Sequence, residues 1–250
     1  MRVSKTALPL VVASCMLVRD LPAQPDTPPR RAHHAMVYDE ARQMVLLTAG
    51  STPLDGGRRF QFFNDLWGWN GTGWIPLGES GDRVSGIGLV YDTRQQRVVS
   101  FGGYSGSGSI ADLRALTGDQ WRLLGRLDGM AVAEPGFAYD PGRNRFVAFG
   151  GSAGGGQAAG DTWEFDGNAW EKRSVSGPPA RQAHAMVHDS KRGRIVLFGG
   201  MGSAEAGRPG PSLGDTWEYD GNRWTRMDAG RAAGTGRSGG RRRRRRWLSS

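Results

Sequence analysis

The fold is decided by a ten-residue block that occurs four times without gaps: DLWGWNGTGW (65–74), DLRALTGDQW (112–121), DTWEFDGNAW (161–170) and DTWEYDGNRW (215–224). Asp opens every copy, Gly is its seventh residue and Trp closes it. Upstream of each block, an aromatic or His residue followed by Asp, and then a pair of small residues, recur in constant order. Self-similarity with a period of about 50 residues predicts a repeat architecture in which each unit packs on its neighbours.

Each unit is predicted to contain four short strands. An Asp after the first strand begins a polar turn, and the second strand is a β-branched and aromatic run typical of strands that are buried on both faces. We expect first strands at His34–Tyr38, Ile87–Tyr91, Gly136–Tyr139 and His184–His188. We expect second strands at Met44–Thr48, Arg97–Phe101, Arg145–Phe149 and Arg194–Phe198. We expect third strands at Leu66–Trp69, Leu113–Leu116, Thr162–Phe165 and Thr216–Tyr219.

Three sets of repeated residues are assigned structural roles. Small residues after the second strand permit positive φ and a sharp turn: Gly50, Gly102, Gly103, Gly150, Gly151, Gly199 and Gly200. The closing aromatics are expected on the fourth strand, packed between units: Trp74, Trp121, Trp170 and Trp224. The repeated carboxylates are expected to cap turns or bind backbone N–H groups: Asp39, Asp92, Asp140 and Asp189, and Asp65, Asp112, Asp161 and Asp215.

A four-stranded antiparallel sheet of this size cannot bury both of its faces alone. Sheets of this kind are stable when they pack face to face around an axis, as in a β-propeller of 4–8 blades. The predicted fold class is therefore all-β, with a propeller over residues 31–229. Its blades are expected at about 31–81, 82–129, 130–180 and 181–229.

The repeat resembles bacterial kelch repeats, the family that includes the propeller of galactose oxidase. The resemblance rests on the Gly-Gly pair after an apolar strand (Val196–Gly200), on Tyr219 with Trp224, and on the approach segment Pro178–Met186. It covers about residues 28–228 and implies the fold rather than a function, because kelch propellers serve many roles. Copy two departs from the pattern, since Arg114 and Leu116 replace aromatics. The family usually has five to seven blades, so four copies indicate either a four-bladed ring or part of a larger propeller. The abrupt change of composition after Gly230 favours the second.

The formal net charge of +9, from 33 Lys and Arg against 24 Asp and Glu, is concentrated at the two ends of the chain. The last 20 residues hold eight Arg and no acid, whereas residues 24–230 are close to neutral. Nucleic acid is therefore not an expected partner of the propeller. The tail at 230–250 is expected to be disordered. It is interpreted as a basic arm, a plain solvated tail or a reading-frame artefact.

Residues 1–23 are predicted to be an export signal, followed by a linker at 24–30. Arg2 and Lys5 precede the apolar run Ala7–Val18, and Ala23 offers a cleavage site. The expected location is periplasmic or secreted. Cys15 follows a lipobox-like Val-Ala-Ser, so a lipid-anchored envelope protein is the alternative, and a membrane is an expected partner only in that case.

No catalytic residue and no cofactor are predicted. Copper-radical chemistry like that of galactose oxidase needs a Tyr–Cys cross-link, and Cys15 in the signal is the chain's one Cys. His34 and His184 each follow an Arg by three residues, and a closed four-bladed ring would make them neighbours and candidate metal ligands. The preferred interpretation is that each Arg-x-x-His is a structural element of the repeat.

Recognition is expected in the loops between the second and third strands, which vary in sequence on a repeated scaffold. These loops are Ser51–Asn64, Tyr104–Ala111, Ser152–Gly160 and Met201–Gly214. The first has the most binding-like content, with Arg58, Arg59, Phe60, Phe62 and Phe63, although it is equally well explained as a loop packed on its own blade.

The predicted function is that of an exported, non-catalytic binding or scaffold module for a carbohydrate or a protein. One alternative is a propeller enzyme, a glycan hydrolase or lyase, with a site built from loops. Another is nucleic-acid binding through the Arg tail.

Overall fold

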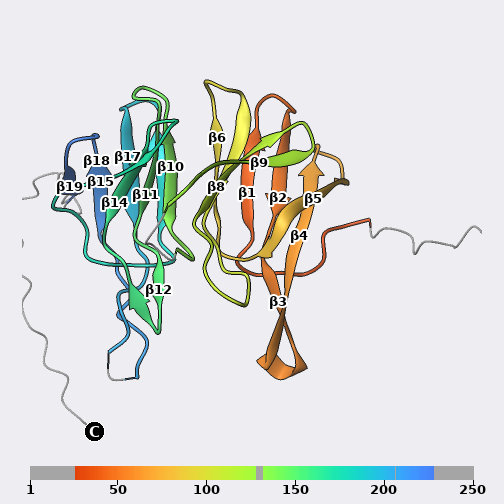
Figure 1. Cartoon of the computed structure of the whole chain (residues 1–250), viewed down its shortest axis with the longest axis horizontal. Coiled ribbons are helices and arrows are strands. Elements are labelled where there is room, and N and C mark those ends of the chain that lie inside the picture. The colour runs from red at the N-terminus through yellow and green to blue at the C-terminus, as the bar shows by residue number, and fades with distance from the viewer. Residues whose placement is uncertain (1–25, 128–131, 206, 228–250) are drawn as a thin grey trace, which may run out of the picture.

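The computed structural model describes residues 26–127, 132–205 and 207–227, which form four large antiparallel sheets in sequence order and one small two-stranded sheet (Figure 1). The four large sheets are the blades. The predicted export signal with Cys15 and the Arg-rich tail lie outside these residues. We call the sheets blades 1 to 4. Blade 1 has β1 (Ala35–Asp39), β2 (Met44–Thr48), β4 (Arg59–Trp69) and β5 (Trp74–Val84), with β3 (Ser51–Leu54) added to β4; blade 2 has β6 (Gly88–Asp92), β7 (Arg97–Phe101), β8 (Asp112–Thr117) and β9 (Gln120–Arg126). Blade 3 has β10 (Gly136–Asp140), β11 (Arg145–Phe149), β14 (Thr162–Phe165) and β15 (Trp170–Arg173); blade 4 has β16 (Ala185–Asp189), β17 (Arg194–Phe198), β18 (Thr216–Tyr219) and β19 (Trp224–Met227).

The turns that separate these strands form as the sequence predicts. After β16, the carboxylate of Asp189 accepts the backbone N–H groups of Lys191 and Arg192, both at 3.0 Å. Asp39, Asp92 and Asp140 cap the corresponding turns of the other blades. The glycines after the second strands all have positive φ, between 61° and 117°, so the chain turns there as expected.

The prediction of a loop at Ser51–Asn64 is wrong, because most of this segment forms a hairpin. β3 pairs with the beginning of β4, Ser51 opposite Phe62 and Leu54 opposite Arg59, and the 3₁₀ turn η1 (Asp55–Gly57) connects them. A smaller hairpin, β12 (Ser152–Gly154) with β13 (Gln157–Ala158), lies within the third predicted loop. Both hairpins project from the same end of the molecule (Figure 1).

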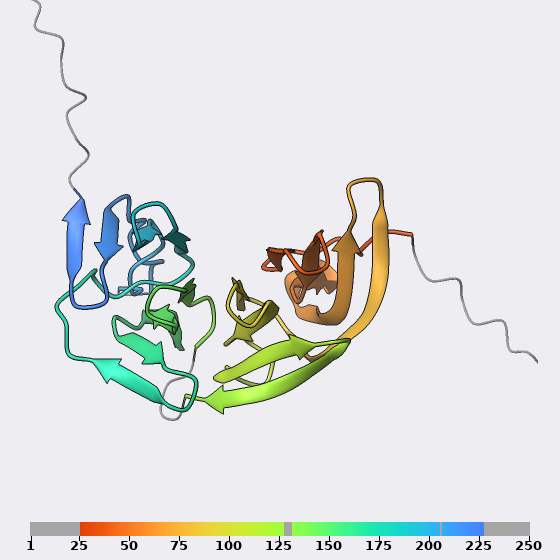
Figure 2. The ribbon, with the colours of Figure 1, turned by 90° about the horizontal axis from the view of Figure 1, so that it is seen from above.

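The four blades stand side by side in an open arc, with blades 1 and 4 at its two ends (Figure 2). The first strands β1, β6, β10 and β16 lie on the inside of the arc, and each contacts the next. This is the radial packing of propeller blades. The described residues do not close into a ring. Of the two alternatives given by the sequence, the four-bladed ring is therefore wrong.

The space between successive blades is filled by the apolar cores that the repeat predicts. The closing Trp of one blade packs on the blade before it. Trp170 lies 4.7 Å from Phe101 between ring centroids, and Trp224 lies 5.4 Å from Phe149. Trp121 packs in the core between blades 1 and 2. Trp74 instead contacts Trp69 of its own blade, because no described blade precedes it.

The outer face of blade 4 has no neighbour among the described residues. Phe198 is 54% exposed, whereas Phe101 and Phe149 occupy the same repeat position and are fully buried. The apolar residues of β17 are therefore of the kind found in a sheet that is covered on both faces.

Within blade 4, a buried arginine fastens the approach segment to the ten-residue block. The guanidinium of Arg181 is fully buried and donates to both carboxylate oxygens of Asp215, at 2.7 and 3.0 Å, and to the Gly199 carbonyl at 2.8 Å. The indole of Trp217 donates to the same carboxylate at 2.7 Å. The hydrogen bonds from Arg181 and Trp217 hold the pKa of the Asp215 carboxyl well below its usual range.

Blade 1 repeats this arrangement with Arg31, Asp65 and Trp67. The structural interpretation of the Arg in Arg-x-x-His therefore agrees with the contacts. Blades 2 and 3 have Val84 and Val132 at the Arg position.

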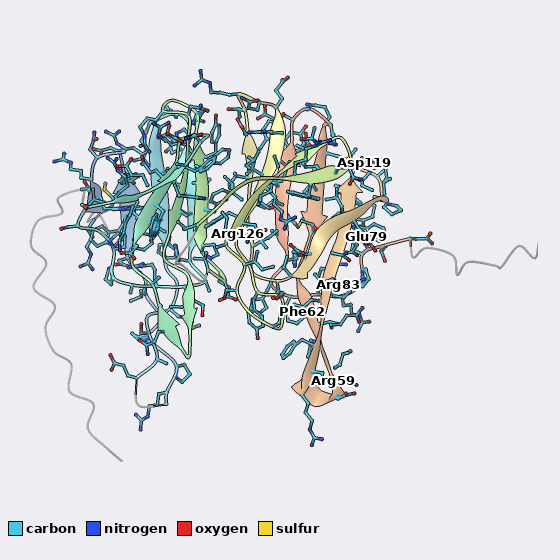
Figure 3. All side chains as sticks on the ribbon, viewed as in Figure 1. Arg59, Phe62, Glu79, Arg83, Asp119 and Arg126 are labelled. Atoms are coloured by element: carbon cyan, nitrogen blue, oxygen red, sulfur yellow. The ribbon has the colours of Figure 1, made fainter. Side chains whose placement is uncertain are left out.

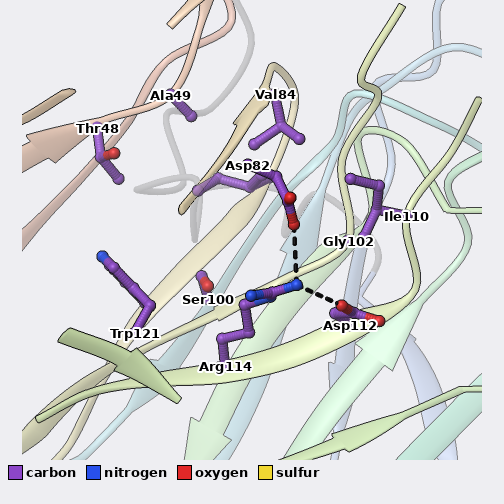
Figure 4. Close-up of a pocket in the computed structure, with 11 residues that line it drawn as sticks. Thr48, Ala49, Asp82, Val84, Ser100, Gly102, Ile110, Asp112, Arg114 and Trp121 are labelled. Atoms are coloured by element: carbon purple, nitrogen blue, oxygen red, sulfur yellow. Dashed lines mark hydrogen bonds and ion pairs between the residues drawn. The ribbon is translucent and has the colours of Figure 1, made fainter. Parts of the chain in front are cut away.

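In blade 2 a different residue supplies the guanidinium. Arg114, the residue that departs from the kelch-like pattern, bridges Asp112 at 2.7 Å and Asp82 at 2.9 Å (Figure 4). Arg126 adds a second contact to Asp112 at 2.6 Å. In blade 3, Asp161 is half-exposed and pairs with Lys172. A carboxylate at this position thus keeps a cationic partner in every blade.

Replacing Arg181 with Met is expected to lower the free energy of unfolding by about 3 kcal/mol, because the largely buried Asp215 carboxylate loses its cationic partner. Equilibrium urea unfolding measures the change. The control is Arg223→Met, since Arg223 is 79% exposed and is expected to contribute less than about 0.5 kcal/mol. Equal losses in the two variants would contradict a structural role for the buried pair.

Candidate functional site

One residue from each blade contributes to a row of backbone hydrogen bonds around the inside of the arc. The four residues precede the first strands at equivalent repeat positions, and each has positive φ between 53° and 65°: His33, Gly86, Glu134 and Ala183. Gly86 N–H donates to His33 O at 2.9 Å, Glu134 N–H to Gly86 O at 2.8 Å, and Ala183 N–H to Glu134 O at 3.1 Å. We call this row the inner belt.

Two side chains of the inner belt meet above its glycine. Nδ1 of His33 lies 2.8 Å from Oε1 of Glu134, although the residues belong to blades 1 and 3. A Cβ on Gly86 would lie 2.8 Å from Cγ of Glu134, so the glycine gives the Glu134 side chain its space. Gly and Ala stand at the other two belt positions. The belt position is therefore variable among the four copies, and variable positions on a repeated scaffold are candidates for recognition.

A pocket of about 330 Å³ lies over this pair, at the end of the arc from which the β3–β4 hairpin projects. We call it the mouth pocket. Its aromatic wall consists of Phe60, Phe62 and Tyr104; Phe60 is 54% and Tyr104 40% exposed, and the Phe62 and Tyr104 ring centroids are 5.9 Å apart. Four hydroxyl-bearing residues also line it: Ser51, Ser85, Ser109 and Ser152. Its volume is at the lower end of the range of small-molecule sites.

The structure separates the five residues predicted as binding candidates. Phe60 and Phe62 line the mouth pocket. Arg58 and Arg59 are exposed at the hairpin tip, where Arg59 pairs with Asp55, while Phe62 lies nearer its base (Figure 3). Phe63 is buried, with the Arg31 guanidinium 4.1 Å from its ring centroid, so it belongs to the blade.

Three lining residues are not among the predicted binding candidates. Tyr104 lies in the second predicted loop. His33 and Glu134 are the two polar residues at the belt position, where the other two copies have Gly86 and Ala183, and this difference between the copies is the sequence signal that marks them.

A second cavity, between blades 1 and 2, is too small for an organic ligand. It has a volume of about 30 Å³ and contains the Asp82–Arg114–Asp112 bridge (Figure 4). This is space for little more than a water molecule. The cavity therefore belongs to the packing between blades.

The two histidines considered as metal ligands line a shared open cavity inside the arc, but their blades lie at its opposite ends. The closed ring on which a His34–His184 site depends is not formed by the described residues. Among those residues, no group of three or more His, Cys, Asp or Glu side chains is arranged to hold a metal. A search of the same residues finds no helix of the length and apolarity that a membrane crossing requires.

His34 and His184 differ in burial. His34 is exposed, whereas His184 is 8% exposed and packs against Phe149, with ring centroids 5.7 Å apart, and against Gly136. Neither ring nitrogen of His184 has a hydrogen-bond partner among the described residues. Burial lowers the pKa of His184 to about 4, so the imidazole is neutral at physiological pH.

This burial predicts a loss of stability in mild acid. Between the ordinary pKa of 6.5 and the folded value of about 4, the unfolded chain binds a proton that the folded chain excludes. The free energy of unfolding is therefore expected to fall by up to about 3 kcal/mol as the pH drops through that window. Urea unfolding between about pH 7 and about pH 4.5 measures the slope.

His184→Gln is expected to flatten this slope, and His34→Gln, at the same repeat position in blade 1, is expected to leave it unchanged. Carboxylates whose pKa is lowered in the folded chain stabilise it until the pH falls below this window, so they do not account for the slope. An unchanged slope in His184→Gln would show that another group causes the acid sensitivity.

Comparison with known proteins supports the fold and gives no information about the site. No family model matches the chain, and no curated protein matches its sequence. The solved structure of YjhT is similar, with a TM-score of 0.65 and 15% sequence identity over 79% of this chain and 70% of that chain. YjhT is a propeller protein, and its likeness agrees with the blade packing described above: the described chain has the all-β fold of β-propeller blades.

Proposed function

We propose that this chain is a non-catalytic, kelch-type propeller module that binds carbohydrate in the mouth pocket. The observation that carries the proposal is the exposed aromatic wall of Phe60, Phe62 and Tyr104 within a concave, hydroxyl-lined pocket. The kelch assignment is supported by the Gly-Gly and Trp motifs together with the blade packing.

The chemistry of a sugar matches both parts of this pocket. A pyranose ring has an apolar face of C–H groups, which packs on aromatic rings, and a rim of hydroxyls that donate and accept hydrogen bonds. Serine hydroxyls and the Glu134 carboxylate can pair with that rim. A pocket of about 330 Å³ suits one or a few sugar units better than a protein, whose stable interface buries on the order of 1,600 Å².

The presence of one carboxylate among the described lining residues favours binding over glycoside hydrolysis. Glycosidases generally use two carboxylates that flank the scissile bond. Among the described lining residues Glu134 is the single acid. A binding module needs no second carboxylate.

The His33–Glu134 contact favours a lyase as the second candidate function. A carboxylate beside an imidazole orients the ring, and His33 is then placed to accept a proton from a bound sugar. Release of unsaturated sugars from acidic polysaccharides, measured by ultraviolet absorbance, would support the lyase over the binding module.

We also propose that the protein is exported, on the basis of the basic, apolar and small-residue segments in residues 1–23. Fusing these residues to a reporter that is active only outside the cytoplasm tests the proposal. Lipid labelling that depends on Cys15 would identify the lipid-anchored alternative.

Phe60→Ala is expected to weaken glycan binding by about tenfold, because an exposed aromatic surface that stacks on the ligand is removed. A glycan array on the full chain identifies the ligand, and isothermal titration calorimetry measures the change. Leu123→Ala is the control, since Leu123 is also 54% exposed but lies on β9, away from the pocket. A folded chain that binds no glycan, or a Phe60→Ala variant with unchanged affinity, would contradict the proposal.

A further inference from the structure

We propose that the mouth pocket selects ligands that carry an ammonium group, so that among carbohydrates it prefers amino sugars in their protonated form. This inference rests on the carbohydrate-binding function proposed above and specifies the ligand of the same pocket.

The first observation is the charge of the lining. Among the described residues that line the mouth pocket, Glu134 carries a negative charge and no Lys or Arg is present. Oε1 of Glu134 lies 2.8 Å from Nδ1 of His33, and among the described residues no Lys or Arg forms an ion pair with this carboxylate. The floor of the pocket therefore presents to the ligand a carboxylate that no Lys or Arg of the described residues neutralises.

The second observation is the aromatic wall beside that carboxylate. Ring faces carry negative electrostatic potential and attract cations that lie within about 6 Å of the ring centroid. Phe62 and Tyr104 meet at an interplanar angle of 60°, so together they form a corner, and Phe60 adds a third ring. A carboxylate combined with two or three aromatic rings suits an ammonium group, which gains both a charge pair and cation–π contacts.

The third observation is that no Arg belongs to the described lining of the pocket, and that two nearby arginines are paired with carboxylates elsewhere. Arg59 pairs with Asp55 at the hairpin tip, and Arg31 pairs with Asp65 within blade 1. Arg83 contacts the Phe62 carbonyl at 3.5 Å. An acidic sugar would therefore meet Glu134 with no guanidinium lining the pocket, and like-charge repulsion would oppose its binding.

The test compares two ligands that differ mainly in charge. A glucosamine tetrasaccharide and its fully N-acetylated counterpart are titrated into the full chain at neutral pH and low ionic strength. The glucosamine form is expected to bind at least tenfold more tightly. Raising the salt concentration is expected to reduce this preference, because ions screen the charge pair.

Two variants locate the preference. Glu134→Gln is expected to abolish it, because the loss of affinity is expected to be at least tenfold larger for the glucosamine form than for the N-acetylated form. Glu205→Gln removes an exposed acid from the blade 4 loop at the same end of the arc, and is expected to retain the preference. Phe60→Leu keeps an apolar side chain but removes a ring face, so it should weaken binding of the glucosamine form more than of the N-acetylated form. Because Phe60 is exposed, this variant does not depend on the effect of Glu134→Gln on folding.

The outcomes separate this inference from the proposed function. Equal affinity for the two tetrasaccharides, or tighter binding of the N-acetylated one, would overturn ammonium selection and leave carbohydrate binding intact. Binding of choline, with neither tetrasaccharide bound, would support ammonium selection and overturn the carbohydrate proposal. A folded chain that binds none of the three probes would overturn both.

Discussion

The pairing of a buried arginine with the first Asp of the ten-residue block holds the inside of a blade in place. In blade 4, Arg181 joins the approach segment, the Gly-Gly turn and the start of β18 through one guanidinium. A fully buried guanidinium requires a complete set of partners, since an unpaired charge in the interior is strongly unfavourable. Its contacts therefore fix the chain two residues before the inner belt. In blade 1, Arg31 does the same for His33, so this structural pair also positions a residue of the candidate site.

The inner belt connects the repeat to the site. Its backbone hydrogen bonds join the four blades, and positive φ recurs at each of its residues even where the residue is not glycine. For His33 and Glu134 this backbone conformation is unfavourable. Belt hydrogen bonds on both sides of Glu134, and one to the carbonyl of His33, help to maintain it. The scaffold thus brings together two side chains that are about 100 residues apart in sequence, and Gly86 leaves the space in which they meet.

Most of the fold follows from the sequence because local signals and the repeat agree. The second strands begin and end at the predicted residues, since each is an apolar run bounded by a polar turn and a small pair. The β3–β4 hairpin was not predicted. Pro53, Gly56 and Gly57 indicate a loop, whereas the pairing of Ser51–Leu54 with Arg59–Phe62 extends a strand already anchored in blade 1. The role of Arg114 also escaped prediction, because it depends on Asp82 and Asp112, which only the folded chain brings together.

The candidate site was predictable in part, for a related reason. The aromatic residues of the first variable segment were correctly favoured, but the charges beside them, Arg58 and Arg59, lie at the hairpin tip and not in the pocket. The charge that faces a ligand is the single carboxylate of Glu134, which is inconspicuous in a chain of net charge +9. The net charge of this chain comes mainly from its two ends and not from the pocket. The side chains that face a ligand come instead from variable positions of the repeat, here those of His33 and Glu134.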